Sequence, residues 1–478
     1  MKHLAADIVV VAAGTAGLPA AVTAAQGGAR VIICEKSDTT GGCPGSGQII
    51  AVESGLQKQK GVKLTRKELF KLHMDYIHWR ADARLVKAFY DESGPTIDWL
   101  EQMGIVFKLE GGPTQYTLTC RPVGSLQARV DVLTNKAKET GVQILLNTPV
   151  KHLIKKDNRI TGVVAEDNTG EEVKIQAGAV IVATGGFGDN PDMIKKYTGF
   201  DWGQNFFSFR VPGLSGDGIR MAWDIGAAES EMGMQLFYGM PHPYGGTSRT
   251  TAELQAFVQP NLMVNLNGER FISEEMQQDA TFVGNNIARQ RNRCAFMIFD
   301  ENTRDYYVKS GLDIPFPGTS GNKADKFDAT LMEAKRQGYQ HLFVAESLDD
   351  LCAQTSIDLN GLEKTVNEYN KCCENGYDTI FQKDPKFLKP VKQSKFYAAR
   401  FFPRAYGSTG GIKINHKTEV LNREEKAIPG LYAAGVDAAA IYGDSYTWSL
   451  FGNPSGFATN SGRIAGRNAM EYIKRTGK

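Results

Sequence analysis

The chain has 478 residues, a formal net charge of +2 and a pI near 8.0, which predicts roughly two or three domains. This near balance of charge gives no reason to expect nucleic acid or an anionic membrane surface as a partner, and no apolar run is long enough to span a membrane. Seven irregularly spaced cysteines, with no CxxC pair, argue against a disulfide framework and against a metal site.

The first predicted elements are a strand, a turn of small residues and a helix, within residues 8–25. The apolar run at 8–11 is typical of a buried parallel strand, and it begins so early that no room remains for a signal peptide, so we expect a cytoplasmic protein. Such a turn directs backbone N–H groups at a pyrophosphate. The residues predicted to do so are Ala13, Gly14, Thr15, Ala16 and Gly17. One departure from the usual fingerprint is Ala12, which stands where the first glycine is expected.

A second apolar strand, at 31–34, ends at Glu35. A carboxylate at this place accepts hydrogen bonds from a ribose 2′-OH and disfavours a 2′-phosphate. The loop after it, up to residue 50, is rich in small residues, which let a backbone run close to a planar ligand. The ligand contacts predicted after the acid are Lys36, Gly41, Gly42, Cys43 and Gly47.

Residues 65–104 are expected to be helical, with a break at Gly94-Pro95. His73 and His78 lie in this part of the chain and are expected to pack or to face solvent rather than to bind a ligand. A strand at 141–146 then brings Val150 back toward the nucleotide. Two short strands near 160–165 and 172–175 follow, joined by a tight turn at 167–170.

Further segments end in small residues where a cofactor could approach. An apolar strand at 179–182 leads to Ala183, Thr184 and Gly185, and Asp217 begins a helix at about 219–226. Late in the chain, a strand at 429–434 leads to Gly435 and Asp437. The final helix starts at 452–456, with Ser455 and Gly456 in its first turn.

Together these motifs resemble the FAD-dependent flavoproteins of the fumarate reductase and 3-ketosteroid dehydrogenase superfamily. The resemblance runs nearly end to end and includes the Asn267-Gly268-Glu269-Arg270-Phe271 segment. It implies an α/β fold with a Rossmann-like FAD-binding domain formed by 1–237 and 396–478, and an inserted α+β capping domain at 238–395. It also implies that the final helix points its N-terminus at the flavin pyrimidine edge. Because residues 41–50 contain no histidine, we expect non-covalent FAD.

The dicarboxylate site that fumarate reductases use is not expected here. Alignment places Gln278 at the proton-donor position, Gly407 where a histidine is expected and Ser449 where an arginine is expected. A neutral amide is a poor general acid. Arg270 is expected to make a structural ion pair rather than to bind substrate.

Aromatic and hydroxyl side chains take the place of the charged residues of the dicarboxylate site. They suit a bulky, mostly apolar substrate with one carbonyl. By resemblance to the ketosteroid side of the superfamily, Tyr446 and Tyr442 are the first candidates for acid/base, and Tyr406 or His242 for the carbonyl partner. Hydride would pass between flavin N5 and the carbon β to the carbonyl. We favour reduction of a steroid-like, bile-acid-like or phenolic enone over the reverse dehydrogenation. Each tyrosine alone could equally be a packing residue.

Two other functions stay open. One is a fumarate-type reductase of a small unsaturated carboxylate, and the other is an electron-carrying flavoprotein without a substrate of its own. A simple NAD-dependent dehydrogenase is less favoured, because the late glycine-rich segments would have no role. Since no CxxCH motif occurs, electrons must come from NADH, a reduced flavin or a redox protein rather than from a fused haem module.

Overall fold

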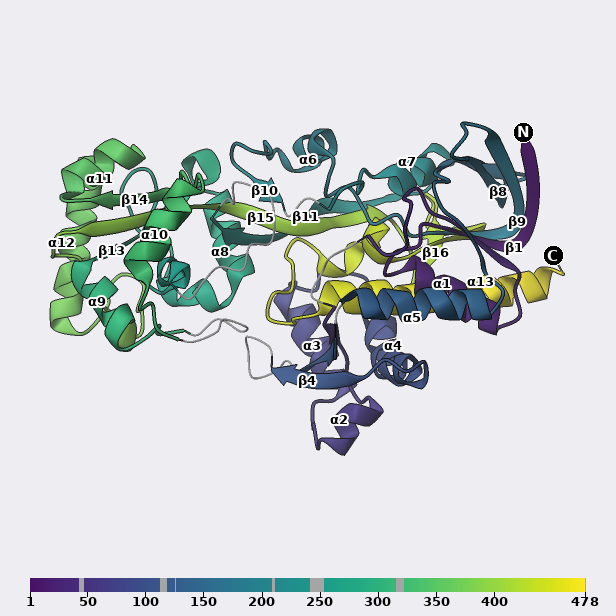
Figure 1. Ribbon diagram of the computed structural model, residues 1–478, viewed down its shortest axis with the longest axis horizontal. Coiled ribbons are helices and arrows are strands. Elements are labelled where there is room, and N and C mark those ends of the chain that lie inside the picture. Colours follow the sequence, from purple (N-terminus) through teal and green to yellow (C-terminus); the bar gives the residue numbers. More distant parts are fainter. Residues whose placement is uncertain are drawn as a thin grey trace. The chain divides into compact units, whose positions relative to one another are not determined.

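The computed structural model describes residues 1–42, 47–111, 118–124, 126–208, 211–240, 253–314 and 322–477. It divides into two compact units (Figure 1). The first is formed by Met1–Gly199, Val211–Gln235 and Gly407–Lys478, and the second by Phe200–Arg210 and Leu236–Tyr406. The domain limits predicted from the sequence differ from these at 200–210, 236–237 and 396–406. The second unit is thus inserted into the chain of the first, and strands β11 (Glu229–Gly239) and β15 (Phe396–Ile412) each run from one unit into the other.

The first unit is built on a mainly parallel sheet with β1 in its interior. Its strands are, in spatial order, β16 (Glu419–Leu421), β17 (Ala427–Ala433), β9 (Glu172–Val182), β1 (Lys2–Val11), β2 (Val31–Cys34) and β6 (Gln143–Leu145). All but β16 run parallel to their neighbours, and β7 (Val150–Lys156) and β8 (Arg159–Glu166) extend β9 as an antiparallel hairpin. Because β1 has a strand on each side and is covered on both faces, residues 8–11 are continuously apolar and buried.

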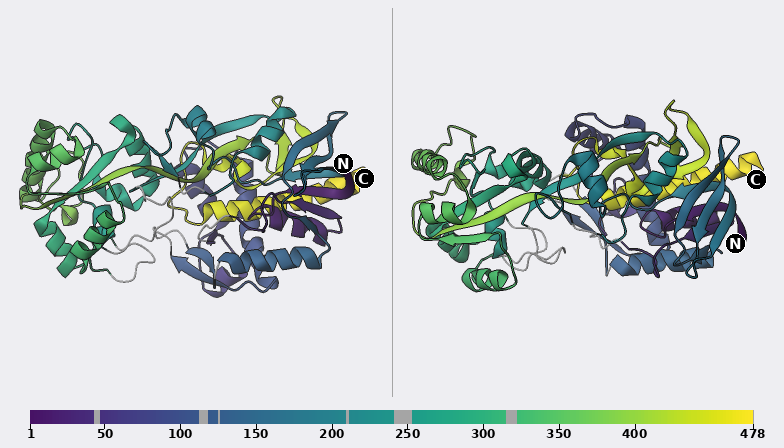
Figure 2. Two further views of the ribbon diagram at one scale, coloured as in Figure 1. Left: turned by 45° about the horizontal axis from the view of Figure 1, so that its top comes forward. Right: turned by 90° about the horizontal axis from the view of Figure 1, so that it is seen from above.

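Helix α1 (Gly17–Gln26) packs against α5 (Leu126–Glu139) and against the last helix, α13 (Asn453–Thr476). The contact between α1 and α13 is made backbone to backbone. A Cβ on Gly462 or on Gly466 would overlap the carbonyl oxygens of Ala16 and Ala20, respectively. Glycines one turn apart therefore let the two helices approach closely, and they bring the last helix onto the first βαβ unit (Figures 1 and 2).

A smaller helical layer surrounds a three-stranded sheet in the same unit. The strands are β3 (Ile49–Ile50), β5 (Leu118–Pro122) and β4 (Phe107–Gly111), and the helices are α2 (Gly55–Gln59), α3 (Arg66–Tyr76) and α4 (Ala83–Gln102). Helix α4 continues through Gly94 and Pro95, so the predicted break there is wrong. Gly94 instead serves close packing, because a Cβ on it would lie 2.5 Å from the carbonyl oxygen of Val52. Helices α6 (Pro191–Thr198) and α7 (Asp217–Asp224) complete the unit.

In the second unit, the first half of β15 is paired on both sides. Strands β13 (Ala295–Asp300) and β14 (Leu342–Ala345) run antiparallel to it, β12 (Leu262–Val264) follows β13, and the short β10 (Phe207–Ser208) pairs further along. The helices are α8 (Ala280–Ala288), α9 (Glu301–Lys309), α10 (Phe327–Arg336), α11 (Leu348–Thr355) and α12 (Leu359–Asn375). A separate apolar core forms between these elements, around Phe296, Ile298 and Tyr369. In the described ranges, no helix is long and apolar enough to cross a membrane.

Candidate functional site

The carboxyl ends of β1, β2, β9 and β17 meet at one edge of the parallel sheet, because these strands run in the same direction. The segments that leave them are the turn at 12–17, Glu35, the turn at 183–186 and the segment 434–437. Ligands of doubly wound sheets bind outside such an edge, where the chain leaves adjacent strands in opposite directions. Most of the residues predicted to bind a nucleotide therefore share one location.

The first turn keeps the expected shape although it lacks the first glycine. Ala12 adopts a φ of 85°, in the left-handed region that favours glycine, and its N–H donates to the carbonyl of Cys34 at 2.8 Å. A Cβ on Gly17 would overlap the carbonyl oxygen of Ala12, so only glycine fits there. No described side chain caps α1, whose N-cap is Ala16. The N–H groups of its first turn are therefore suited to bind an anion.

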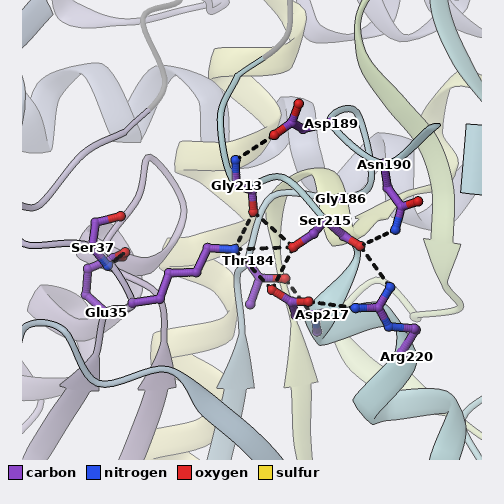
Figure 3. Close-up of polar contacts among 12 residues, drawn as sticks. Glu35, Ser37, Thr184, Gly186, Asp189, Asn190, Gly213, Ser215, Asp217 and Arg220 are labelled. Carbon is purple, nitrogen blue, oxygen red and sulfur yellow. Dashed lines mark hydrogen bonds and ion pairs between the residues drawn. The ribbon is translucent and has the colours of Figure 1, made fainter. Parts of the chain in front are cut away.

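Glu35 is buried and held by two backbone N–H groups, of which that of Ser37 lies beside it in Figure 3. Ala13 donates to Oε2 at 2.7 Å and Ser37 donates to Oε1 at 2.9 Å. The carboxylate is thereby fixed between the first turn and the end of β2, while each oxygen keeps acceptor capacity for a ribose hydroxyl. Gly41 belongs to the same arrangement, since its N–H donates to the carbonyl of Ala13 at 3.0 Å.

Lys36 joins the end of β2 to the start of α7, 181 residues later in the chain. Its Nζ donates to Asp217 Oδ2 at 3.0 Å and also contacts Ser215 and the carbonyl of Gly213. Arg220 donates to the other oxygen of Asp217 at 2.7 Å (Figure 3). Burial opposes ionisation of Asp217, but the hydrogen bonds from Lys36 and Ser215 lower its pKa below the ordinary value. The carboxylate is therefore charged at neutral pH.

Asp437 organises the turn after β9. It is fully buried and accepts hydrogen bonds from the N–H of Gly186 at 2.8 Å, from the hydroxyl of Thr184 and from the N–H of Thr184. Ala183 in turn donates to the carbonyl of Val11 at 3.0 Å, and Gly185 has a φ of 95°. The Asp437 carboxylate therefore has a structural role, because it holds the turn after β9 in place. This role is additional to its predicted contact with a cofactor.

The start of α13 is linked to the glycine-rich loop by Arg129, a residue that the sequence analysis missed. Its Nη1 donates to Ser455 Oγ at 3.1 Å and to the carbonyl of Gly47 at 3.3 Å, and the side chain is buried. Gly452 is the N-cap of α13, with a φ of 84° and no capping side chain, and Gly456 lies in the first turn. A single arginine on an amphipathic helix gives no sequence pattern, so only the structure associates it with this site.

Of the remaining predicted cofactor residues, Gly42 and Gly435 have positive φ values of 83° and 67°, and Val150 begins β7. A Cβ on Gly42 would meet nothing within 4 Å, whereas one on Gly435 would lie 2.9 Å from the Cβ of Ala16. Cys43 lies outside the described residues.

Two of the candidate tyrosines lie together in the first unit. Tyr442 and Tyr446 are 1% and 3% exposed, and their rings meet edge to face at 5.6 Å. Among the described residues, the Tyr442 hydroxyl has no hydrogen-bond partner, and burial raises its pKa well above the ordinary value. A buried hydroxyl of this kind is costly to leave unpaired, which makes it a candidate for contact with a ligand.

Tyr406 belongs to the second unit, where its ring stacks on Phe237 at 4.5 Å. The residue is 36% exposed, and the partial loss of water around its hydroxyl raises the pKa of Tyr406, although the nearby Arg404 opposes this shift. Arg404, which the sequence analysis also missed, is partly buried in the same unit and donates to the carbonyl of Met240 at 3.1 Å. His242 lies outside the described residues. The contribution of Tyr406 and His242 to one site with the other two tyrosines stays a prediction.

Arg270 makes the structural ion pairs that were predicted for it. Its guanidinium donates to Glu274 at 2.9 and 2.8 Å and to Asp378 at 3.1 and 2.7 Å, and all three side chains are at most 3% exposed. Lys383, also fully buried, lies 3.4 Å from Glu274. Gln278, aligned with the fumarate-type proton donor, is exposed.

A parallel sheet with a glycine-rich first turn, a terminal acid on its second strand and uncapped helix starts defines a nucleotide-binding flavoprotein fold. The FAD binding domain family matches residues 7–448, so the chain belongs to this family and its cofactor is FAD.

Similar proteins cover nearly the whole chain. A vinyl phenol reductase of Lactiplantibacillus plantarum is 33% identical over 98% of this chain and 97% of its own length. A cytochrome fumarate reductase of Shewanella frigidimarina is 30% identical over 99% of this chain and 78% of its own length. The crystal structure of 3-ketosteroid Δ1-dehydrogenase from Sterolibacterium denitrificans has the same fold, with a TM-score of 0.78 at 19% identity, over 98% of this chain and 99% of that chain. The predicted superfamily, fold class, FAD cofactor and FAD-dependent oxidoreductase acting on CH–CH groups are confirmed.

The described residues fit FAD on structural grounds as well. The N-caps of α1, α7 and α13 are Ala16, Gly216 and Gly452, and none of them makes a side-chain cap. In α7, the N–H of Gly218 instead donates to Thr184 Oγ1 at 3.1 Å. No atom of the described residues lies within 4 Å of a Cβ built on Gly42, and Glu35 is fixed at the end of β2. The assignment of individual residues to particular FAD contacts stays a prediction.

Proposed function

We propose that the protein reduces a carbon–carbon double bond conjugated to a carbonyl group or to a phenol ring, in a largely apolar substrate. The observation that carries the proposal is the buried pair Tyr442 and Tyr446, just before the start of α13. The Tyr442 hydroxyl has no hydrogen-bond partner in the part of the chain that the structure describes. The 33% identity with a vinyl phenol reductase over almost the full length supports a phenolic substrate. A steroid-like or bile-acid-like enone is the other member of this substrate class.

The protein's own groups have three tasks in this reaction. The N–H groups of the first turn of α1 would hold the FAD pyrophosphate, Glu35 would accept hydrogen bonds from the ribose, and the start of α13 would interact with the flavin. FAD, held non-covalently, supplies the hydride. Tyr446 is the first candidate to give a proton to the carbon next to the activating group, with Tyr442 second. Because burial raises the pKa of Tyr442, this residue stays protonated at neutral pH and also suits a hydrogen bond to a substrate oxygen.

Tyr406 and His242 are proposed as partners of the substrate oxygen. We favour reduction over dehydrogenation, with NADH or a redox protein as electron donor and the cytoplasm as compartment. The second candidate function is reduction of a small unsaturated carboxylate. It is favoured by the 30% identity with a fumarate reductase and by Arg404, a partly buried cation that alignment did not anticipate. An electron-carrying flavoprotein without a substrate is the third.

The test is anaerobic reoxidation of the flavin. The purified protein is reduced with dithionite and mixed with 4-vinylphenol, a steroid enone or fumarate, and the return of oxidised flavin absorbance is followed. Rapid return with 4-vinylphenol or the enone, but not with fumarate, supports the proposal. Return with fumarate alone refutes it in favour of the carboxylate reductase, and no return with any of them favours the electron carrier.

Tyr446→Phe tests the proton donor in the same assay. It is expected to slow reoxidation at least about 100-fold at unchanged FAD content, within the range of general acid catalysis. Tyr377→Phe is the matched control, because Tyr377 is 53% exposed in the other unit. A Tyr446→Phe rate equal to that of the control would remove Tyr446 as the acid.

A further inference from the structure

A fully buried histidine, His73, contacts the segment 441–447, which contains Tyr442 and Tyr446. His73, on α3, is 0% exposed, with Nε2 2.7 Å from the carbonyl oxygen of Ile441 and Nδ1 2.7 Å from the hydroxyl of Tyr90. A carbonyl oxygen only accepts, so Nε2 must carry the proton. Nδ1 is then the acceptor, and Tyr90 donates to it. Burial lowers the pKa of His73 to about 4, so the ring is neutral at physiological pH and this tautomer is fixed.

The same network reaches the first residue of α13. Asn453 is fully buried, and its Nδ2 donates to Thr447 Oγ1 at 3.0 Å and approaches His73 Nδ1 at 3.4 Å. Thr447 is itself fully buried. The network therefore holds the chain at three places, the carbonyl of residue 441, the side chain of residue 447 and the start of the helix at residue 453.

These anchor points flank the two tyrosines. Ile441 immediately precedes Tyr442, and Thr447 immediately follows Tyr446. Apolar side chains would fill the same volume without the cost of burying four polar groups. Among the described residues Asn453 Oδ1 has no partner, but the other polar groups of the network meet one another at hydrogen-bond distance. They favour one position of the backbone, because another position would leave further buried donors and acceptors without their partners.

We propose that His73, Tyr90 and Asn453 are positioning residues that fix the segment 441–453, and with it Tyr442 and Tyr446, for proton transfer to the substrate. The inference rests on the proposed function for its catalytic consequence, but the anchoring of the segment can be measured without any substrate. A displacement of about 1 Å in a group that transfers a proton costs up to about 100-fold in rate. A loosened network should therefore lower kcat while leaving the FAD site in place.

The experiment compares three variants of the FAD-loaded protein. In His73→Gln, the amide can donate to Ile441 and accept from Tyr90, as the imidazole does. In His73→Leu neither bond is possible. Tyr90→Phe removes a single hydroxyl and keeps the ring, so it remains informative if His73→Leu does not fold. His416→Leu, a partly exposed histidine of the same unit, is the control.

The readouts are the FAD content, the kcat and KM of flavin reoxidation by 4-vinylphenol or the steroid enone, and hydrogen–deuterium exchange of peptides covering 440–453. We expect exchange there to rise at least about tenfold in His73→Leu and Tyr90→Phe, kcat to fall about tenfold or more, and FAD content to stay unchanged. His73→Gln should restore kcat to within about threefold of wild type.

Unchanged exchange in both Tyr90→Phe and His73→Leu would overturn the proposal, as would a kcat loss that Gln and Leu share equally. If the wild-type flavin is not reoxidised by any conjugated substrate, the proposed function fails. In that case the exchange result alone still decides whether the network anchors the segment.

Discussion

Asp378→Asn is expected to lower the free energy of unfolding of the second unit by about 3 kcal/mol. The carboxylate receives two hydrogen bonds from Arg270, at 3.1 and 2.7 Å, and neither side chain is more than 3% exposed. Removing one partner of a buried ion pair costs about 3–5 kcal/mol, because the remaining charge stays buried without compensation. We take the lower end of this range, since Glu274 continues to pair with the guanidinium.

The pKa of Asp378 leads to a similar value for the stabilisation by its ion pair with Arg270. Burial alone would raise it, but the hydrogen bonds from Arg270 lower it to about 2 from the ordinary 3.8. A depressed carboxyl pKa stabilises the folded state above pH 4, and this stabilisation is lost as the pH falls from about 4 to about 2. The shift corresponds to about 2.5 kcal/mol, and Asp378→Asn should abolish this part of the acid sensitivity.

The assay is urea unfolding at pH 7 and at pH 3, with Asp384→Asn as the control. Asp384 forms its ion pair with Lys386 on the surface, so its loss should cost less than about 1 kcal/mol. In the double variant Arg270→Met/Asp378→Asn, Glu274 and Lys383 remain as a balanced pair. The loss of unfolding free energy in the double variant should therefore be smaller than the sum of the losses in Arg270→Met and Asp378→Asn by at least about 1 kcal/mol. Additive effects, or a loss below 1 kcal/mol for Asp378→Asn, would refute a structural role for Arg270.

Three further outcomes are expected. Gly17→Ala should yield protein without bound FAD, judged by the ratio of flavin to protein absorbance, because the new methyl group overlaps the carbonyl oxygen of Ala12. Gly111→Ala, where a Cβ meets no atom of the described residues within 4 Å, is the control, and normal FAD content in Gly17→Ala would contradict the close approach. Ala12→Gly should raise the free energy of unfolding by about 1 kcal/mol in a urea titration, since it relieves a left-handed alanine, and a lower value would contradict that strain. For His73, the pKa is about 4 in the folded protein and ordinarily 6.5, so only the unfolded chain binds this proton between those values. Acidification from pH 6.5 to 4 should therefore cost wild type about 3 kcal/mol more than His73→Gln, and equal losses would contradict the burial of a neutral ring.

The local parts of the fold could be predicted from the sequence. The first βαβ unit, Glu35 and the start of the last helix each depend on a run of adjacent residues with a recognisable period or composition. The prediction of a break at Gly94-Pro95 is wrong because a helix packed against α3 and α13 tolerates residues that would end an isolated helix. Helix propensity is a local property, whereas the packing of Gly94 against Val52 depends on the fold. This packing favours a helix that continues through Gly94.

Long-range features could not be predicted in this way. Arg129 meets Ser455, and His73 meets Ile441, across more than 300 residues of chain. Neither residue is part of a motif, and each gains its role from the partner that the fold brings to it. Gly462 and Gly466 are similar, because the sequence does not reveal that another helix lies against them.

The order of segments in the first unit has a consequence for synthesis on the ribosome. The strand β1 emerges first, but α13, which packs on α1 and starts at residue 453, emerges only after the whole of the second unit has been made. The nascent chain therefore holds an incomplete nucleotide site while residues 236–406 are already free to fold. A stop codon shortly before residue 453 should leave a chain that cannot retain its cofactor, although β1, Glu35 and the whole second unit have been made.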